Sequence, residues 1–332
     1  MHAQSEYELS FWQGKKVLVA GGAGFIGSHL VERLVRSGSV VTVLVRATAT
    51  TQRNLKDCLD KVQLTIGDIR RPEDCRRAVQ RQDVVFNVAG EVGGIGYNVC
   101  NHSSAFLNNV LMNLALLEAA RLENVERYEC TSSTCVYSRE KSVIAREDQG
   151  FVDDPEPTVL GYGWAKRVAE LQARFYAKEY GMKIAIVRPT NAYGPRDNFD
   201  PETSHVIPAL IRRVFESTSR IRVWGSGTQT RSFIFVKDIA RGIMDVTERY
   251  AVADPINLGT EEEIQVSDLV KLIIQLSGKK LDLDFDLTKP EGQPRKFADI
   301  SKAIDRINWY PETTLQEGLR ETISWYKAAI RS

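Results

Sequence analysis

The chain contains 332 residues, of which 43% are hydrophobic and 26% are charged, and its formal net charge at pH 7 is +1. These values are typical of a soluble globular protein with enough apolar residues for one large domain or two coupled ones. The near-neutral balance gives no indication of a nucleic-acid partner or of a membrane surface. The residues before the first strand carry charges and no long apolar run, so we expect neither a signal peptide nor a membrane span there.

The spacing of cysteine and histidine bears on metal binding and on the cellular compartment. The five cysteines are scattered, odd in number and never spaced as Cys-x-x-Cys, which argues against a disulfide framework and against a zinc site. The four histidines include no pair at the spacing of helix-borne ligands. We therefore expect a cytoplasmic protein without a metal.

Short apolar strands alternate with amphipathic helices over the first 190 residues. Buried parallel strands read as apolar runs, and helices make the crossovers between them. This rhythm predicts an α/β fold with a doubly wound parallel sheet of the Rossmann type. The expected strands span residues 15–20, 40–46, 62–68, 83–90, 125–133 and 182–195, and the expected helices span 25–37, 72–82, 103–124 and 161–181.

Beyond about residue 190 the rhythm changes, because a loop rich in Pro, Gly and Asp follows the sixth strand. We expect helices over 205–217, 266–278 and 314–332, short strands over 221–227, 255–259 and 281–287, and a strand-helix unit over 233–250. The predicted organisation is a dinucleotide-binding Rossmann domain (14–190 plus 230–260) and a smaller α/β nucleotide-sugar-binding domain (191–229 plus 261–332). Ligands should bind where the parallel strands end.

The glycine turn after the first strand fits G-x-G-x-x-G over residues 22–27. Its glycines allow a tight turn and a close approach to a pyrophosphate, and the helix that follows offers free N–H groups. The alternative is a glycine-rich turn that binds nothing, but the strand before it and the helix after it favour a dinucleotide site. The expected cofactor contacts at this turn are Gly21, Gly24, Phe25, Ile26 and Gly27.

The end of the second strand bears on the choice between NAD and NADP. An NAD site usually has Asp or Glu there, whereas this chain has Arg46, which can pair with a 2′-phosphate. NADP(H) is therefore favoured, NAD remains possible, and Arg46 could also be a solvated strand-end charge. Asp68 could reach the adenine edge or could cap a helix. Ile69, Ala89 and Lys166 complete the expected cofactor contacts.

Tyr162 and Lys166 form a Tyr-x-x-x-Lys motif at the start of a predicted helix, so both side chains share one helix face. An ammonium near a phenol lowers the pKa of the phenol, and Tyr162 could then exchange a proton with a sugar hydroxyl or ketone. Ser133, at the end of the fifth strand, should lie nearby. The motif is common by chance when it stands alone, but its position in a nucleotide-binding fold makes it more specific.

GGAGFIG, the serine after the fifth strand and YGWAK together resemble the signature of the extended short-chain dehydrogenase/reductase family, and the resemblance covers nearly the whole chain. It implies a catalytic triad of Ser133, Tyr162 and Lys166, and a nucleotide-activated sugar as substrate. Within the family, the chain is similar to the branch of GDP-L-fucose synthases and GDP-mannose 3,5-epimerases. The similar stretches are 92–98, 132–137, 198–213, 224–233 and 289–301, while Gly90 and Ser138 depart from the usual alanine and proline.

The resemblance implies that Cys135 and His205 move protons at C3 and C5 of a 4-keto sugar, since a thiol and an imidazole both exchange protons near neutral pH. Alternatively, the cysteine fills the core and the histidine caps a helix. The resemblance also implies a homodimer that forms a four-helix bundle from helices 104–123 and 162–180, although these helices could instead pack on the sheet. The implied substrate contacts are Val92, Gly93, Gly94, Asn191, Val206, Arg213, Trp224, Arg231 and Arg295.

Three functions remain open from the sequence. The first is NADPH-dependent 3,5-epimerisation and 4-reduction of a GDP-4-keto-6-deoxy-hexose. The second is a redox-neutral nucleotide-sugar epimerase with tightly bound NAD. The third is a non-catalytic dinucleotide-binding regulator, which would not need the intact triad. A 4,6-dehydratase is disfavoured because Thr134 and Cys135 stand where such an enzyme has an Asp-Glu pair.

Overall fold

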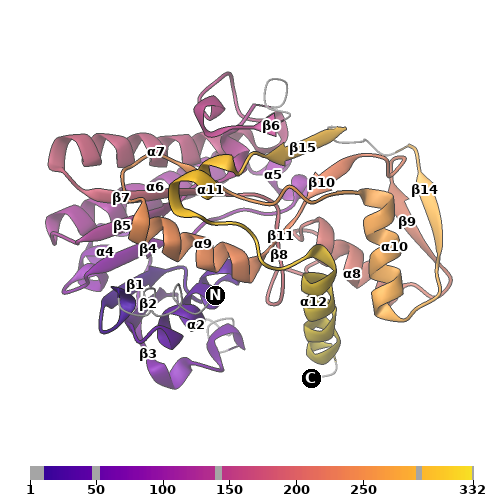
Figure 1. Cartoon of the computed structure of the whole chain (residues 1–332), viewed down its shortest axis with the longest axis horizontal. Helices are drawn as coiled ribbons and strands as arrows, with labels where there is room; N and C mark the ends of the chain where they lie inside the picture. Colours follow the sequence, from indigo (N-terminus) through magenta and orange to yellow (C-terminus); the bar gives the residue numbers. More distant parts are fainter. Residues whose placement is uncertain (1–10, 47–52, 139–143, 289–293, 331–332) are drawn as a thin grey trace.

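The computed structural model describes residues 11–46, 53–138, 144–288 and 294–330 (Figure 1). Its centre is a seven-stranded sheet with the order β12-β7-β5-β4-β1-β2-β3, in which every neighbouring pair is parallel. The predicted doubly wound α/β fold is therefore confirmed. The strands are β1 (Lys16–Ala20), β2 (Val40–Val45), β3 (Val62–Ile66), β4 (Val84–Asn87), β5 (Arg127–Thr131), β7 (Lys183–Pro189) and β12 (Ile256–Leu258).

Helices cover both faces of this sheet, because alternate residues of each buried strand point to opposite sides. In β1, Val17 and Val19 join one apolar core, whereas Leu18 and Ala20 join another. The first core lies under α2 (Phe25–Arg36), α9 (Val236–Arg249) and α11 (Ser301–Ile307). The second lies under α4 (Pro72–Val79), α6 (His102–Leu122) and α7 (Leu160–Tyr180) (Figure 1).

A third apolar core organises the smaller part of the molecule, at the right of Figure 1. Its helices are α8 (Val206–Glu216), α10 (Val266–Ser277) and α12 (Leu315–Ala329), which pack with the parallel pair β9 (Arg220–Trp224) and β14 (Asp282–Asp286). The parallel pair β8 (Ala192–Tyr193) and β11 (Ile234–Phe235) connects this core to the central sheet. A four-stranded sheet completes this part, formed by β13 (Glu263–Gln265), β10 (Thr230–Ser232), β15 (Arg295–Ala298) and β6 (Ile144–Ala145).

Several short elements were not expected from the sequence. They are α5 (Ile95–Cys100), α11, β6, β10, β13 and β15, and the 3-10 turns η1 (Leu59–Lys61), η2 (Thr134–Val136), η3 (Glu147–Gln149) and η4 (Pro157–Val159). The expected domain division stays a prediction. Segments assigned to one predicted domain contact segments assigned to the other. β10 pairs with β13 and β15, while Ala303 and Ile307 of α11 join the core beneath α9.

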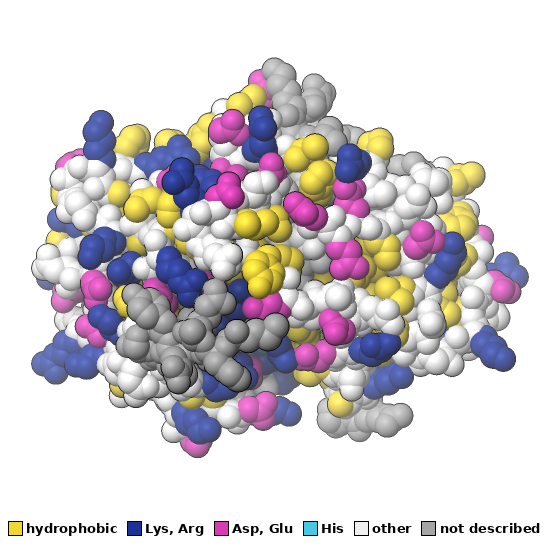
Figure 2. All heavy atoms as spheres, in the orientation of Figure 1, with side chains coloured by type: hydrophobic (Ala, Val, Ile, Leu, Met, Phe, Trp, Pro, Cys, Tyr) yellow, Lys and Arg dark blue, Asp and Glu magenta, His cyan; other side chains and the backbone are white. Residues whose placement is uncertain are grey.

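None of the helices in the described ranges is both long enough and apolar enough to cross a membrane. The expectation for the N-terminal segment concerns residues 1–10, which lie outside the described residues. The face drawn in Figure 2 intersperses Lys and Arg side chains with Asp and Glu, as the near-neutral net charge suggests.

Candidate active site

The glycine turn brings the carboxyl ends of β1 and β4 into close contact. Gly21 has a left-handed φ of 83°, and a Cβ added there would lie 2.8 Å from the backbone of Ala89. A Cβ on Gly27 would collide with the carbonyl oxygen of Gly21, so α2 packs directly on the turn. α2 begins at Phe25 without an acidic residue in its first turn and without a side-chain cap, and its N-terminal N–H groups are therefore suited to a phosphate.

The second part of the predicted cofactor site surrounds Arg46 and Asp68. Arg46 follows β2 and is exposed. Arg70 hydrogen-bonds both carboxylate oxygens of Asp68, and this pairing lowers the pKa of Asp68 to about 2, with a smaller contribution from Arg46. Asp68 does not cap α4, whose N-cap residue is Arg71, so that alternative is wrong. Ile69 is half-buried and packs against the core beneath α4 and α6.

Tyr162 and Lys166 lie in the first turns of α7 and are both buried. The ammonium of Lys166 donates a hydrogen bond to the carbonyl of Thr131 at 2.7 Å and lies 5.5 Å from the ring centroid of Tyr162. Ser133 follows β5; its side chain hydrogen-bonds Tyr162 and also accepts the backbone N–H of Cys135 at 3.1 Å. The structure therefore brings together the three members of the expected triad.

The lowered pKa expected for Tyr162 is not found. Burial raises the pKa of its hydroxyl well above the usual range, the nearby Cys135 raises it further, and the hydrogen bond with Ser133 only partly opposes these effects. Burial also lowers the pKa of Lys166. The physical reason is that burial penalises the charged phenolate, while the ammonium of Lys166 donates its hydrogen bond to the carbonyl of Thr131. The raised pKa favours the protonated hydroxyl of Tyr162.

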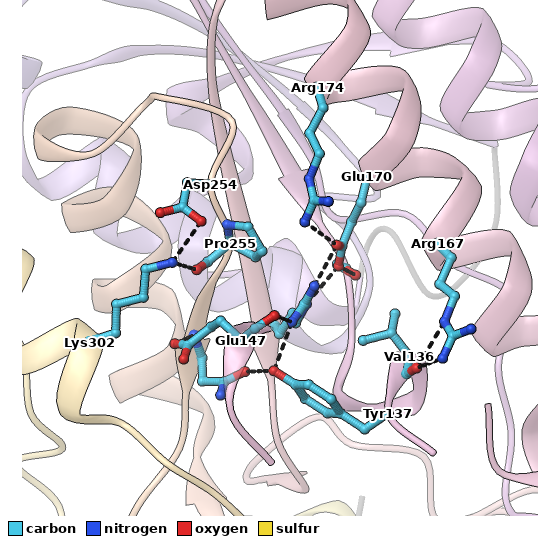
Figure 3. Close-up of polar contacts among 12 residues, drawn as sticks. Val136, Tyr137, Glu147, Arg167, Glu170, Arg174, Asp254, Pro255 and Lys302 are labelled. Atoms are coloured by element: carbon cyan, nitrogen blue, oxygen red, sulfur yellow. Dashed lines mark hydrogen bonds and ion pairs between the residues drawn. The ribbon is translucent and has the colours of Figure 1, made fainter. Parts of the chain in front are cut away.

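The backbone that follows β5 is held by buried polar groups (Figure 3). Arg167 donates two hydrogen bonds to the carbonyl of Val136, at 2.7 and 3.0 Å. The hydroxyl of Tyr137 accepts from Arg188 at 2.9 Å and donates to Asn257 at 2.6 Å. These contacts fix η2 on its C-terminal side, one residue beyond Cys135.

A buried ion pair fixes the other side of the same segment. Glu170 and Arg188 are fully buried and form two hydrogen bonds of 2.7 Å. The hydroxyl of Ser132 donates to Glu170 at 2.5 Å. Because Ser132 precedes Ser133 and Tyr137 ends η2, one network anchors both flanks of the segment that carries Ser133 and Cys135.

Cys135 differs from most other cysteines of the chain in its exposure. Cys58, Cys75 and Cys130 are buried, whereas Cys135 is only half-buried. Its backbone lies against α7, since a Cβ added at Gly163 would be 2.5 Å from the carbonyl oxygen of Cys135. The cysteine thus lies beside the Tyr162 turn and is not a fully buried core residue.

His205 is the N-cap residue of α8, and its half-buried ring lies beside a buried carboxylate. Its Nδ1 is 3.5 Å from Oδ1 of Asp197, and this partner raises the pKa of His205 despite an opposing contribution from burial. The segment before His205 is joined to the loop at 92–94, which carries three of the expected substrate contacts, because the N–H of Gly94 donates to the carbonyl of Thr203 at 2.9 Å.

The loop at 92–94 has one exposed and one buried side. Val92 is exposed, while the carbonyl of Gly93 accepts a hydrogen bond of 2.6 Å from the buried Asn98. A Cβ on Gly94 would lie 2.6 Å from the carbonyl oxygen of Ser204, so only glycine permits this approach. Val206, which follows His205, is exposed at the start of α8. The loop and the start of α8 thus form one joined unit.

The three arginines expected at the pyrophosphate have different environments in the structure. Burial lowers the pKa values of Arg213 on α8 and Arg231 on β10, and Nε of Arg213 is buried with no partner among the described residues. Arg295 instead forms a two-pronged ion pair with Glu263 at 2.6–3.2 Å. It stands opposite Thr230 in the four-stranded sheet, so its side chain points to the opposite face from Arg231.

Two other predicted substrate contacts lie near this sheet. The side chain of Asn191 donates to the carbonyl of Ser232 at 3.0 Å, which ties it to β10. Trp224 is the last residue of β9, but its side chain is outside the described parts of the structure, as are residues 289–293 of the last similar stretch.

Comparison with known proteins identifies the family. Residues 17–259 match the model of the NAD dependent epimerase/dehydratase family, which is more than half of the chain. The chain belongs to this family. The match confirms the resemblance seen in the sequence, and this epimerase/dehydratase family member is an NAD(P)-dependent nucleotide-sugar enzyme of the extended short-chain dehydrogenase/reductase type.

Individual relatives cover almost all of this family member. It is 28% identical to GDP-mannose 3,5-epimerase of Arabidopsis thaliana over 96% of the chain and 85% of that protein. It is 32% identical to GDP-L-fucose synthase of Escherichia coli strain K12, over 94% and 96% of the two chains. Among solved structures, an epimerase from Methanothermobacter thermautotrophicus superimposes with a TM-score of 0.88 at 28% identity, over 99% and 97% of the two chains.

The glycine turn of this epimerase/dehydratase family member fits the dinucleotide that the family uses. The left-handed Gly21, the direct packing of Gly27 and the open first turn of α2 leave room and free donors for a pyrophosphate. The described residues contain no group of three His, Cys, Asp or Glu side chains that could hold a metal ion.

Sequence reasoning missed two residues of this site. Gly90 borders the Tyr-Lys pair, because a Cβ added there would lie 3.9 Å from both the hydroxyl of Tyr162 and Nζ of Lys166. Asp197 is the carboxylate beside His205. It lies eight residues before His205 in a loop without periodicity, so the sequence gives little sign of the contact.

Proposed function

We propose that the protein converts a GDP-4-keto-6-deoxy-hexose by epimerising C3 and C5 and then reducing the C4 ketone with NADPH. The observation that carries this proposal is the half-exposed Cys135, which lies beside the hydrogen-bonded Ser133 and Tyr162. A reductase alone needs the tyrosine and serine but has no use for a thiol at that place. The similarity to a GDP-L-fucose synthase and to a GDP-mannose 3,5-epimerase supports both halves of the reaction.

In the epimerisation, Cys135 acts as base and His205 as acid. Breaking the C–H bond at C3 or C5 gives its proton to the sulfur and its electron pair to the C4 ketone as an enolate. The raised pKa of His205 favours the protonated imidazole, which returns a proton to the carbon from the opposite face. Each inversion leaves a thiol and a neutral imidazole, so exchange with solvent must reset the pair before the second carbon reacts.

In the reduction, Tyr162 supplies the proton. A bound NADPH would supply the hydride for C4; the hydroxyl of Tyr162 protonates O4, and Ser133 hydrogen-bonds that oxygen. A tyrosine whose pKa is raised by burial holds its proton until negative charge develops on O4, which suits the reductive direction. Lys166 orients the tyrosine and would pair with the tyrosinate that remains.

The proposed cofactor is NADP(H), because the exposed Arg46 at the end of β2 can pair with a 2′-phosphate and a carboxylate could not. For the sugar nucleotide, we propose that Arg213 and Arg231 bind the pyrophosphate. Burial lowers the pKa values of both guanidinium groups, and phosphate oxygens would accept hydrogen bonds from these groups.

We further propose a homodimer formed by α6 and α7. Leu107, Leu111 and Leu114 recur at helical spacing on α6, and each is at least 39% exposed. Phe175 of the adjacent α7 is 61% exposed. A second copy of the two helices would cover this apolar face as a four-helix bundle. None of the described cysteines forms a disulfide bond, which is consistent with the cytoplasmic location that we include in the proposal.

A redox-neutral 3,5-epimerase is the second candidate, because Cys135 and His205 would serve both reactions and a relative of that kind is 28% identical. Incubation with GDP-4-keto-6-deoxy-mannose and NADPH distinguishes the two. We expect absorbance of the reduced nicotinamide to fall, GDP-fucose to form, and NADPH to be used faster than NADH. New sugars from GDP-mannose without nicotinamide oxidation would refute the reductase and leave the epimerase.

The thiol is tested separately. Cys135→Ser should abolish solvent-deuterium uptake at C3 and C5 of the keto sugar while leaving NADPH binding intact. Cys100→Ser, which removes an exposed thiol elsewhere, is the matched control and should exchange normally. Undiminished deuterium uptake by the Cys135 variant would show that Cys135 is not the base and has a structural role instead.

A further inference from the structure

Asp197 is a buried carboxylate, and His205 is the ionisable side chain that lies beside it. Its side chain is only 2% exposed, and Oδ1 accepts the backbone N–H of Asn198 at 2.7 Å. Oδ2 is buried and has no hydrogen-bond partner among the described residues. Nδ1 of His205, at 3.5 Å, is the nearby group that can carry a positive charge. A buried, half-satisfied carboxylate is costly, so its position beside a titratable ring requires an explanation.

We propose that Asp197 is a positioning residue for His205, which holds the imidazole in one orientation and keeps it protonated for its role as the acid in epimerisation. A carboxylate at Nδ1 selects the ring orientation in which Nε2 faces away and is left for the substrate carbon. The partner's negative charge also stabilises the imidazolium. This inference rests on the proposed function, because the reaction that His205 serves is taken from it. The contact between Asp197 and His205 does not depend on that function.

Both ends of the loop that carries Asp197 and His205 are fixed. Arg196, in a left-handed conformation with φ of 69°, forms an ion pair of 2.8 Å with Glu32 of α2 and donates to the carbonyl of Asn54 at 2.7 Å. Asn54 in turn donates to the carbonyl of Ala23 in the glycine turn at 3.0 Å. The position of the carboxylate is thereby tied to the cofactor turn.

At its other end, the loop is joined to the 92–94 segment by the hydrogen bond from Gly94 to Thr203. Two other charged groups of the loop and of α8 have partners of their own. Asp200 accepts backbone N–H groups of its own loop, and Arg212 pairs with Glu216 at 2.9 Å. Asp197 is therefore the charged group that acts on His205 in the described structure.

The first test measures the ring directly. In Asp197→Asn, the amide oxygen can still accept the N–H of Asn198, so the loop should keep its shape while the charge disappears. NMR titration of isotope-labelled histidine, with the His205 signals assigned through His205→Gln, should show the pKa of His205 falling below its ordinary value, because the opposing effect of burial remains. Asp200→Asn makes the same chemical change three residues away, at an exposed side chain, and should leave the pKa unchanged.

The second test uses the proposed reaction. Asp197→Asn should slow deuterium uptake at C3 and C5 by about ten- to a hundredfold at neutral pH and move the pH profile of uptake to lower pH, with NADPH affinity unchanged. An unchanged pKa of His205 in the variant would overturn the positioning role. If the wild-type protein processes no keto sugar, the proposed function fails, yet the titration still decides the role of Asp197. A thermal unfolding transition of Asp197→Asn equal to that of the wild type excludes a folding defect as the cause.

Discussion

The buried pair of Glu170 and Arg188 should be the most sensitive point of the scaffold behind the site. Arg188→Met removes two hydrogen bonds of 2.7 Å to Glu170 and further bonds of 2.9 Å to Tyr137 and to the carbonyl of Glu147. Since both charges are fully buried, the carboxylate left behind has no solvent to replace its partner. Breaking such a pair costs about 3–5 kcal/mol, and we expect the free energy of unfolding to fall by that amount.

A double-mutant cycle separates the pair from its surroundings. Glu170→Gln and Arg188→Met are measured singly and together by urea unfolding, and the double variant should be more stable than the sum of the single effects by about 1–3 kcal/mol. Arg174→Met is the control, because Arg174 lies 3.7 Å from the same carboxylate but is 37% exposed, so its loss should cost less than about 1 kcal/mol.

The same cycle reports on the active site. Ser132 and Tyr137 both hydrogen-bond this pair and flank Cys135, so Arg188→Met should also reduce the rate of the proposed epimerisation in the protein that remains folded. Single effects that add to within about 0.5 kcal/mol, or a cost for Arg188→Met no larger than that for Arg174→Met, would refute the reasoning.

Two further predictions concern pH and packing. Burial raises the pKa of Glu129, beneath Lys166, to about 8, so this carboxyl stabilises the fold when protonated and that contribution is lost as the pH rises through the folded pKa. Urea unfolding should therefore show the free energy of unfolding falling between about pH 5 and 8, and this decrease should be smaller in Glu129→Gln. An equal decrease in the variant would contradict the role assigned to Glu129. Gly163→Ala should destabilise the protein by about 1–3 kcal/mol, since its Cβ would meet the carbonyl of Cys135 at 2.5 Å. Gly90→Ala, whose Cβ would have no neighbour nearer than 3.5 Å, should be tolerated, and equal thermal unfolding shifts for the two variants would be inconsistent with this geometry.

The sequence predicts those features that depend on local pattern. The strand, glycine turn and helix over 16–36 are contiguous, and Tyr162 and Lys166 lie together because one helix turn separates them. The central sheet follows from the same logic, since apolar strands that alternate with helices have few possible topologies.

Features that depend on long-range pairing were not predictable in the same way. The face on which Arg295 lies is set by β15, a short strand that pairs with residues 144–145 and 230–231. The pKa of Tyr162 depends on burial by elements distant in the sequence, and the Coulomb attraction of Lys166 was the only effect visible beforehand. Asp197 reaches His205 only because the loop between them turns back on itself.

One contact between α7 and η2 runs through the main chain of residue 135, because Gly163 faces the carbonyl oxygen of Cys135. Every amino acid has that carbonyl. A lineage could therefore gain or lose the thiol by a single codon change and keep this packing contact with the neighbouring helix. Reductases with and without epimerising ability could then descend from one another with the redox apparatus already in place.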